Sequence, residues 1–151
     1  NYTAKRRIGS IIRTGGAIVA FFQYGDEFYL KERVVGQNGA AAATTAQTET
    51  LRVPTGLTLQ ARIIAGIRRV NGSGLFYLLV TPLTETDNAP GTSLYTVCAL
   101  AEADRANAST ELLVMTNTSA QIRWRTNDAS ANLPIDIWTI GWRATRGRLA
   151  A

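Results

Sequence analysis

Histidine is absent from this sequence of 151 residues, and cysteine occurs once. Histidine is the usual general base near neutral pH and the commonest metal ligand, so its absence excludes Ser-His-Asp and Cys-His arrangements and most zinc and iron sites. No glycine-rich phosphate-binding loop occurs either. A carboxylate pair of the glycoside hydrolase kind remains chemically available, but the spacing of the acidic residues does not demand one. We therefore expect no enzymatic activity, no metal and no cofactor.

Long apolar runs are also missing. The longest wholly apolar stretch runs from Ala17 to Phe22, which is too short to span a membrane, so we expect no membrane insertion. A single cysteine cannot form an internal disulfide, and stability must therefore come from packing or assembly. Cys98 lies in the apolar run LYTVCAL, which predicts a buried small side chain rather than a nucleophile.

Charged residues make up only 18% of the chain, against about a quarter in average proteins, whereas apolar residues reach an ordinary 46%. A chain of this length buries enough surface to fold as one unit, so we predict a single domain over residues 1–151. The low charge content of a basic protein suggests that other subunits cover part of its surface.

The hydrophobic pattern is that of strands. In DEFYLKERV (26–34) apolar and polar residues alternate, which indicates one buried face and one wetted face. Turn signals at Pro54–Gly56 and at Asn71–Gly74 separate further apolar segments. The stretch 36–48, rich in small residues, is predicted as a long loop or a hairpin tip, and in 101–113 the Asn, Ser and Thr residues favour a loop over a helical turn or two. From about nine short strand candidates we predict an all-β fold: a two-sheet antiparallel β-sandwich, jelly-roll-like, with eight to nine strands.

The three tryptophans lie in the C-terminal part of the chain. Strand alternation in QIRWRT places Trp124 in the core between two exposed arginines. In PIDIWTIGWR (134–143) the same alternation places Trp138 and Trp142 on one face, together with Asp136 and Ile140. The opposite face would carry Ile135, Ile137, Thr139 and Gly141. Since both faces are largely apolar, we predict that this strand is central or covered by another subunit, with the two tryptophans at a packed interface rather than a sugar platform.

Basic residues concentrate at the two ends of the chain. Four of them precede Asp26 and three follow Asp136, with no acidic residue in either end segment, whereas the middle has nine basic and eleven acidic residues. We therefore predict basic arms over 1–16 and 143–151 that dock on acidic surfaces of neighbouring copies, with solvated charges on disordered ends as the alternative. The candidate assembly residues are Arg6, Arg7, Arg13, Trp138, Trp142, Arg143, Arg146 and Arg148. No continuous basic stripe, zinc-finger spacing or RNA-recognition motif occurs, so we do not expect nucleic acid as a partner.

Both ends resemble one group of proteins. The segments YTAKRRIGS (2–10), FFQYGDEF (21–28), TNTSAQIRWRT (116–126) and GWRATRGR (141–148) resemble motifs of small β-rich proteins encoded among the structural genes of tailed bacteriophages and prophages. The resemblance does not extend to the rest of the chain. It implies a virion component, with a tail-fibre or tail-tip piece favoured over a capsid-associated decoration or head-fibre protein. We expect a homo-oligomer, with a trimer favoured, in contact with other virion structural proteins.

An alternative of a different class is a host-glycan-binding adhesin domain. Exposed tyrosines beside acidic loop residues would hold sugars, and the partner would then be a host-surface polysaccharide. The candidate glycan-binding residues are Tyr24, Tyr29, Tyr77 and Tyr95.

Overall fold

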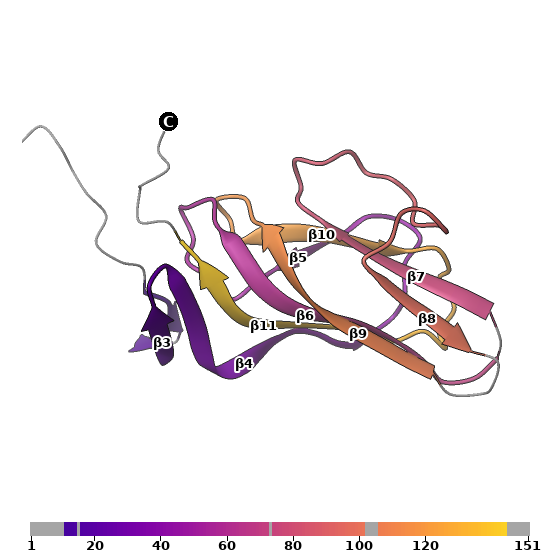
Figure 1. Ribbon diagram of the computed structural model, residues 1–151, viewed down its shortest axis with the longest axis horizontal. Helices are drawn as coiled ribbons and strands as arrows, with labels where there is room; N and C mark the ends of the chain where they lie inside the picture. Colours follow the sequence, from indigo (N-terminus) through magenta and orange to yellow (C-terminus); the bar gives the residue numbers. More distant parts are fainter. Residues whose placement is uncertain (1–10, 15, 73, 102–105, 145–151) are drawn as a thin grey trace, which may run out of the picture.

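The computed structural model describes residues 11–14, 16–72, 74–101 and 106–144, and these form a β-sandwich without helices (Figure 1). The strands are β1 (Arg13–Thr14), β2 (Ala17–Ile18), β3 (Phe21–Tyr24), β4 (Glu27–Ala40), β5 (Gln47–Thr50), β6 (Gln60–Arg69), β7 (Gly74–Thr81), β8 (Val97–Ala101), β9 (Ala106–Met115), β10 (Gln121–Thr126) and β11 (Ile135–Arg143). The large sheet has the order β3-β4-β11-β6-β9 and the small sheet the order β5-β10-β7-β8, while β1 and β2 form a separate short hairpin.

The strand order is that of a jelly roll. The first and last strands of the series β4 to β11 pair with each other, and the pairing continues inward as β5 with β10, β6 with β9 and β7 with β8, all antiparallel. The chain is therefore one long hairpin wound around a core, and the contacts of β11 with β6 and of β10 with β7 complete the two sheets. This confirms the predicted fold class, with β1, β2 and β3 as short additions at one edge.

Strand alternation fills the core between the sheets. Along β6, the side chains of Ala61, Ile63, Ala65 and Ile67 are completely buried, and their neighbours in sequence point outward. Trp124 on β10 is also buried, as its position between two arginines predicts. The prediction for Cys98 is less accurate, because its side chain is only half-buried.

Two predicted loops are partly strand. β4 continues to Ala40 and pairs with β11 over most of its length, so residues 36–40 of the expected loop belong to the sheet. β9 begins at Ala106, and its ten residues pair in unbroken register with β6. Small polar residues at 107 and 109 suggested a loop, but they occupy the outward positions of a strand whose inward positions are apolar or small.

A β-bulge overturns the prediction that Trp138 and Trp142 share a face. Between Thr139 and Gly141, β11 advances two residues while β6 advances one. The extra residue reverses the alternation, so Trp142 points into the core with Ile137, whereas Trp138 remains on the outer face. The ring of Trp142 stacks on that of Phe28, with centroids 4.9 Å apart. β11 itself is central, between β4 and β6, as predicted.

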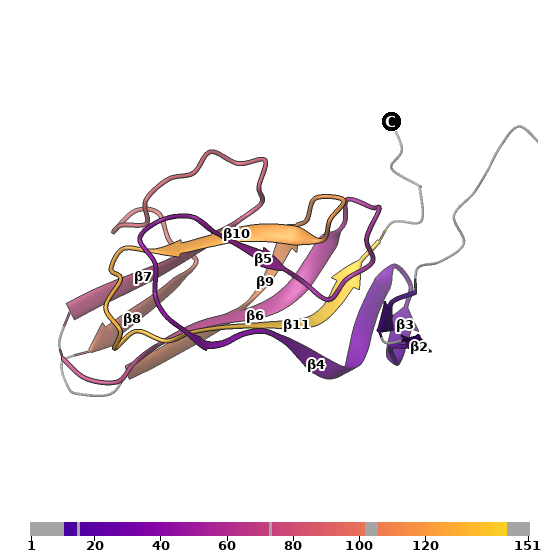
Figure 2. The same ribbon diagram turned by 180° about the vertical axis from the view of Figure 1, so that it is seen from behind.

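The outer faces of the two sheets differ. The segment 82–96 between β7 and β8 passes over the outer face of the small sheet, where Arg123 donates hydrogen bonds to the carbonyl oxygens of Leu83 and Glu85 (Figure 1). Tyr77 and Leu79 point outward from β7 and are nevertheless buried. Figure 2 shows the sandwich from behind, with β4 bending along the large sheet; among the described residues, no comparable segment passes over the outer face of this sheet.

Candidate functional site

The outer face of the large sheet presents side chains in rows across neighbouring strands. One row contains Val35 on β4, Trp138 on β11 and Ile64 on β6, which are paired in register. The next row toward the end of β6 contains Asp136 and Gly66, also paired. The outer face of the sheet is therefore apolar in the first row and polar in the second, and Gly66 in the second row has no side chain.

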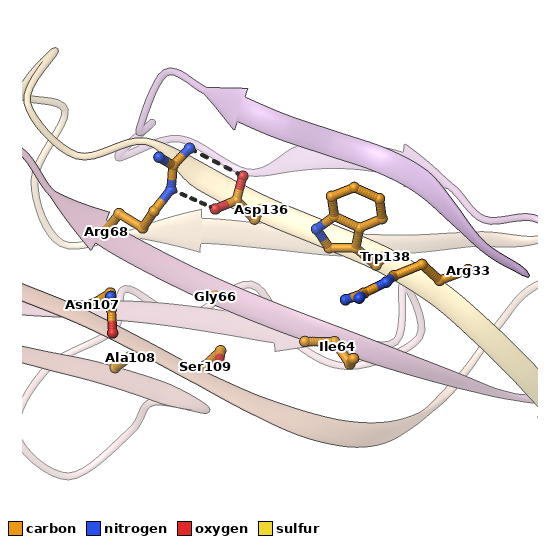
Figure 3. A pocket seen from close by; sticks show the side chains of 9 residues that line it. All are labelled: Arg33, Ile64, Gly66, Arg68, Asn107, Ala108, Ser109, Asp136 and Trp138. Carbon is orange, nitrogen blue, oxygen red and sulfur yellow. Dashed lines mark hydrogen bonds and ion pairs between the residues drawn. The ribbon is translucent and has the colours of Figure 1, made fainter.

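A hollow of about 300 Å³ lies where these rows meet. Figure 3 shows its lining, with Trp138 and Arg33 at one end and Arg68 with Asp136 at the other. The lining residues are Arg33, Ile64, Gly66, Arg68, Asn107, Ala108, Ser109, Asp136 and Trp138. They come from β4, β11, β6 and β9, so four successive strands of the large sheet position the hollow.

Arg33 lies over the indole ring of Trp138, with its guanidinium carbon 5.5 Å from the ring centroid. This is the distance of a cation–π contact. Residues 30–33 of β4 have no partner on β11, because β4 bends away from that strand before pairing resumes at Val34. The bend allows Arg33 to reach across Trp138 toward Ile64 (Figure 3).

At the other end of the hollow, Arg68 and Asp136 form a two-bonded ion pair. The Arg68 Nε and Nη2 groups donate to the two carboxylate oxygens at 2.7 and 3.4 Å. The backbone N–H of Gly39 donates a further bond of 2.8 Å to the same carboxylate. Asp136 is thus held in place by two partners and forms a fixed wall of the hollow.

A second charged cluster lies on the same face, nearer to the end of the chain. Arg62 bonds to Glu111 and Glu27 and lies over the ring of Tyr29. Partial burial lowers the pKa of Arg62, but its hydrogen bond to Glu111 and the neighbouring negative groups outweigh this and raise the pKa above its ordinary value. Arg143 also approaches Glu27, at 3.5 Å. These groups neutralise one another.

The predicted assembly residues are spread over several parts of the molecule. Arg6, Arg7, Arg146 and Arg148 lie outside the described residues. Arg13 donates to the carbonyl oxygen of Gly16, in the β1–β2 hairpin. Trp142 is fully buried within its own chain, so it has no surface to offer a neighbour in this fold. Arg143 and Trp138 both lie on the outer face of the large sheet.

The four candidate tyrosines do not form one site. Tyr24 and Tyr29 belong to β3 and β4 of the large sheet, and Tyr24 is 83% exposed. Tyr77 and Tyr95 lie over the small sheet with ring centroids 5.1 Å apart, and Tyr77 is buried. The sequence reasoning did not identify the residues that line the hollow, apart from Trp138. Alternation indicated strands at the lining residues of β4 and β6, but the lining residues of β9 fall in a predicted loop, and the sequence did not show that these strands are neighbours.

Large apolar side chains are exposed at one end of the sandwich, which we call the terminal end. The described chain begins there at Ile11 and ends there at Ala144, whose N–H donates to the carbonyl oxygen of Asp26 (Figure 1). The terminal apolar residues, each more than half exposed, are Ile11, Ile18, Phe22 and Tyr24. Sequence alternation alone did not distinguish them from core residues.

The described residues contain no group of three or more side chains suited to hold a metal ion. No helix in that part of the chain is long and apolar enough to cross a membrane. Neither a family model nor a curated protein sequence matches this chain.

Proposed function

We propose that this chain is a structural component of a tailed-phage virion, which assembles with copies of itself and with neighbouring virion proteins. The single observation that carries the proposal is the set of exposed apolar side chains at the terminal end. Four large apolar side chains are exposed there, close to the two points from which the basic arms 1–16 and 143–151 continue. Large exposed apolar side chains are typical of protein interaction sites where they form a contiguous patch.

The topology supports the same proposal. Jelly rolls are frequent among viral capsid and lectin domains, although a fold alone does not define a function. The resemblance of the end segments to phage structural proteins favours a virion protein over a lectin. Within a virion we favour a tail-fibre or tail-tip piece, with a capsid-associated decoration or head-fibre protein as the alternative.

In this proposal the terminal apolar residues pack against a second copy, and a trimer is the favoured assembly. Phe22 and Tyr24 point the same way from β3, since they are two residues apart in a strand. Arginines of the arms would then pair with carboxylates of the neighbouring copy. Salt would weaken the second contribution by screening it.

Light scattering on the purified full chain tests the proposal. We expect an oligomer at low salt whose mass falls at high salt. Replacing both exposed aromatics, Phe22→Ser with Tyr24→Ser, is expected to give a folded monomer. Tyr95→Ser is the matched control, because Tyr95 is also exposed but lies over the small sheet. An unmodified chain that is monomeric at both salt concentrations would contradict the proposal.

A host-glycan-binding domain remains the second candidate, and the hollow beside Trp138 is the observation that favours it. The tyrosine set predicted for that function is divided between the two sheets, so the tyrosines do not support a single glycan site.

A further inference from the structure

The hollow on the large sheet combines an aromatic ring, a guanidinium group without an ion-pair partner among the described residues, and two polar side chains without hydrogen bonds there. Of the described arginines, Arg13, Arg62, Arg68, Arg69, Arg123, Arg125 and Arg143 all use their side chains in hydrogen bonds or ion pairs. Arg33 differs from them. Within the described part of the chain its guanidinium contacts the ring of Trp138 and has no carboxylate partner.

Two more side chains border the hollow without an internal role. Asn107 and Ser109 point outward from β9, and neither side chain forms a hydrogen bond within the described ranges. Gly66 lies between Asp136 and Ser109 in the same row. Because it has no side chain, the sheet surface is recessed between these two residues, and the recess gives a ligand access to Asn107 and Ser109.

We propose that this hollow binds an acidic saccharide residue, namely a pyranose ring that carries a carboxylate. Such a ring has apolar C–H groups on its face, hydroxyl groups around its rim and one negative charge. The hollow offers an apolar wall in Trp138 and Ile64 and hydrogen-bonding groups in Asn107 and Ser109. Arg33 supplies the charge that pairs with the carboxylate, in the two-bonded geometry that guanidinium groups favour.

The size and shape of the hollow agree with a single sugar ring. Its volume of about 300 Å³ lies at the small end of the range for ligand sites, and its lining mixes apolar surface with a few polar groups. Arg68 and Asp136 are already bound to each other, so they orient hydroxyl groups rather than take the charge. This leaves Arg33 as the group that distinguishes an acidic sugar from a neutral one.

This inference goes beyond the structural role proposed above, and a chain that failed to assemble could still show it. The hollow is also distant along the large sheet from the terminal apolar residues, since it is lined from the far half of β6 and the first half of β9. Assembly through the terminal end therefore leaves the hollow open to a polysaccharide.

Titration calorimetry of the full chain with oligogalacturonate tests the inference, with the methyl ester of the same oligosaccharide as the neutral control. We expect binding of the acid and about tenfold weaker binding of the ester, the usual loss when a charged hydrogen-bonded pair is removed. Trp fluorescence gives an independent signal, because Trp124 and Trp142 are buried and Trp138 is the accessible indole.

The variants are chosen as a pair on one strand. Arg33→Gln is expected to weaken binding of the acid about tenfold, whereas Lys31→Gln should change it less than about twofold. Lys31 is also exposed on β4, and its substitution removes the same charge as that of Arg33. Lys31 does not line the hollow. Both side chains are on the surface, so both variants are expected to fold, which circular dichroism verifies.

Three results would overturn the inference. The first is no binding of the acid by the folded chain. The second is an equal loss of affinity in Arg33→Gln and Lys31→Gln, which would indicate general attraction between charges. The third is a stronger effect of a glutamate-rich peptide than of oligogalacturonate on the fluorescence of Trp138, which would identify the hollow as a protein-docking site.

Discussion

The outer faces of the two sheets carry similar side chains but use them differently. On the small sheet, the chain covers its own surface with residues 82–96, and Arg123 and Arg125 hold this segment through Glu85 and Asp87. On the large sheet, Arg33 and Trp138 line an open hollow. Arg123 and Arg125 thus stabilise the fold on the small sheet, whereas Arg33 on the large sheet forms no hydrogen bond or ion pair within the described residues.

The comparison extends to the aromatic residues. Trp142 and Trp138 are four residues apart on β11, and the β-bulge sends one into the core and the other to the surface. Substitutions of Trp142 and Trp138, and of Arg125 and Arg33, compare residues of the two kinds. A loss of stability identifies a residue that maintains the fold.

The largest effect is expected for Trp142→Ala. Because the indole is completely buried against Phe28 and Phe21, its removal should lower the free energy of unfolding by about 3–5 kcal/mol. Trp138→Ala, in contrast, should cost less, since its side chain is only partly buried, on the outer face of the sheet. Urea denaturation measures both, and similar losses in the two variants would contradict the assignment of the two faces.

Gly141→Ala should destabilise the bulge itself. An added Cβ would lie 2.1 Å from the carbonyl oxygen of Phe28, so the backbone of β4 must shift. We expect a loss of about 1–3 kcal/mol in the free energy of unfolding, again measured in urea. Gly91→Ala is the control, because an added Cβ there meets no atom within 4 Å. Equal stability of the two variants would show that β4 does not press on β11 at this point.

A smaller loss of stability is expected from substitutions on the outer face of the small sheet. Arg125→Gln removes a 3.0 Å ion pair to Asp87 and a hydrogen bond to the carbonyl oxygen of Thr44, and it should cost about 1–2 kcal/mol. Arg33→Gln, which removes no hydrogen bond within the described residues, should change stability by no more than about 0.5 kcal/mol. Thermal unfolding of the two variants compares them directly. If Arg33→Gln were the less stable of the two, Arg33 would have a structural role.

Much of the fold follows from local sequence patterns, but the site depends on neighbours in space. Alternation along QARIIAGIRR (60–69) defines both faces of β6, and the turn at Gly56 is confirmed by its φ of +77°. Gly141 inside a strand pattern is a local signal for a bulge or a close backbone approach, but the alternation of PIDIWTIGWR was continued through it, so the bulge was not predicted. Arg33 and Ser109 meet at one hollow only because the jelly-roll order brings β4, β6, β9 and β11 together.

Hydroxyl-radical footprinting of the assembled and the dissociated chain compares the two sheets most directly. Tyr24 and Tyr95 are both exposed within one chain, one at the terminal end and the other over the small sheet. If assembly proceeds through the terminal end, the oxidation rate of Tyr24 falls several-fold on assembly and that of Tyr95 is unchanged. An unchanged rate at Tyr24, or protection confined to Tyr95, would contradict assembly through this surface.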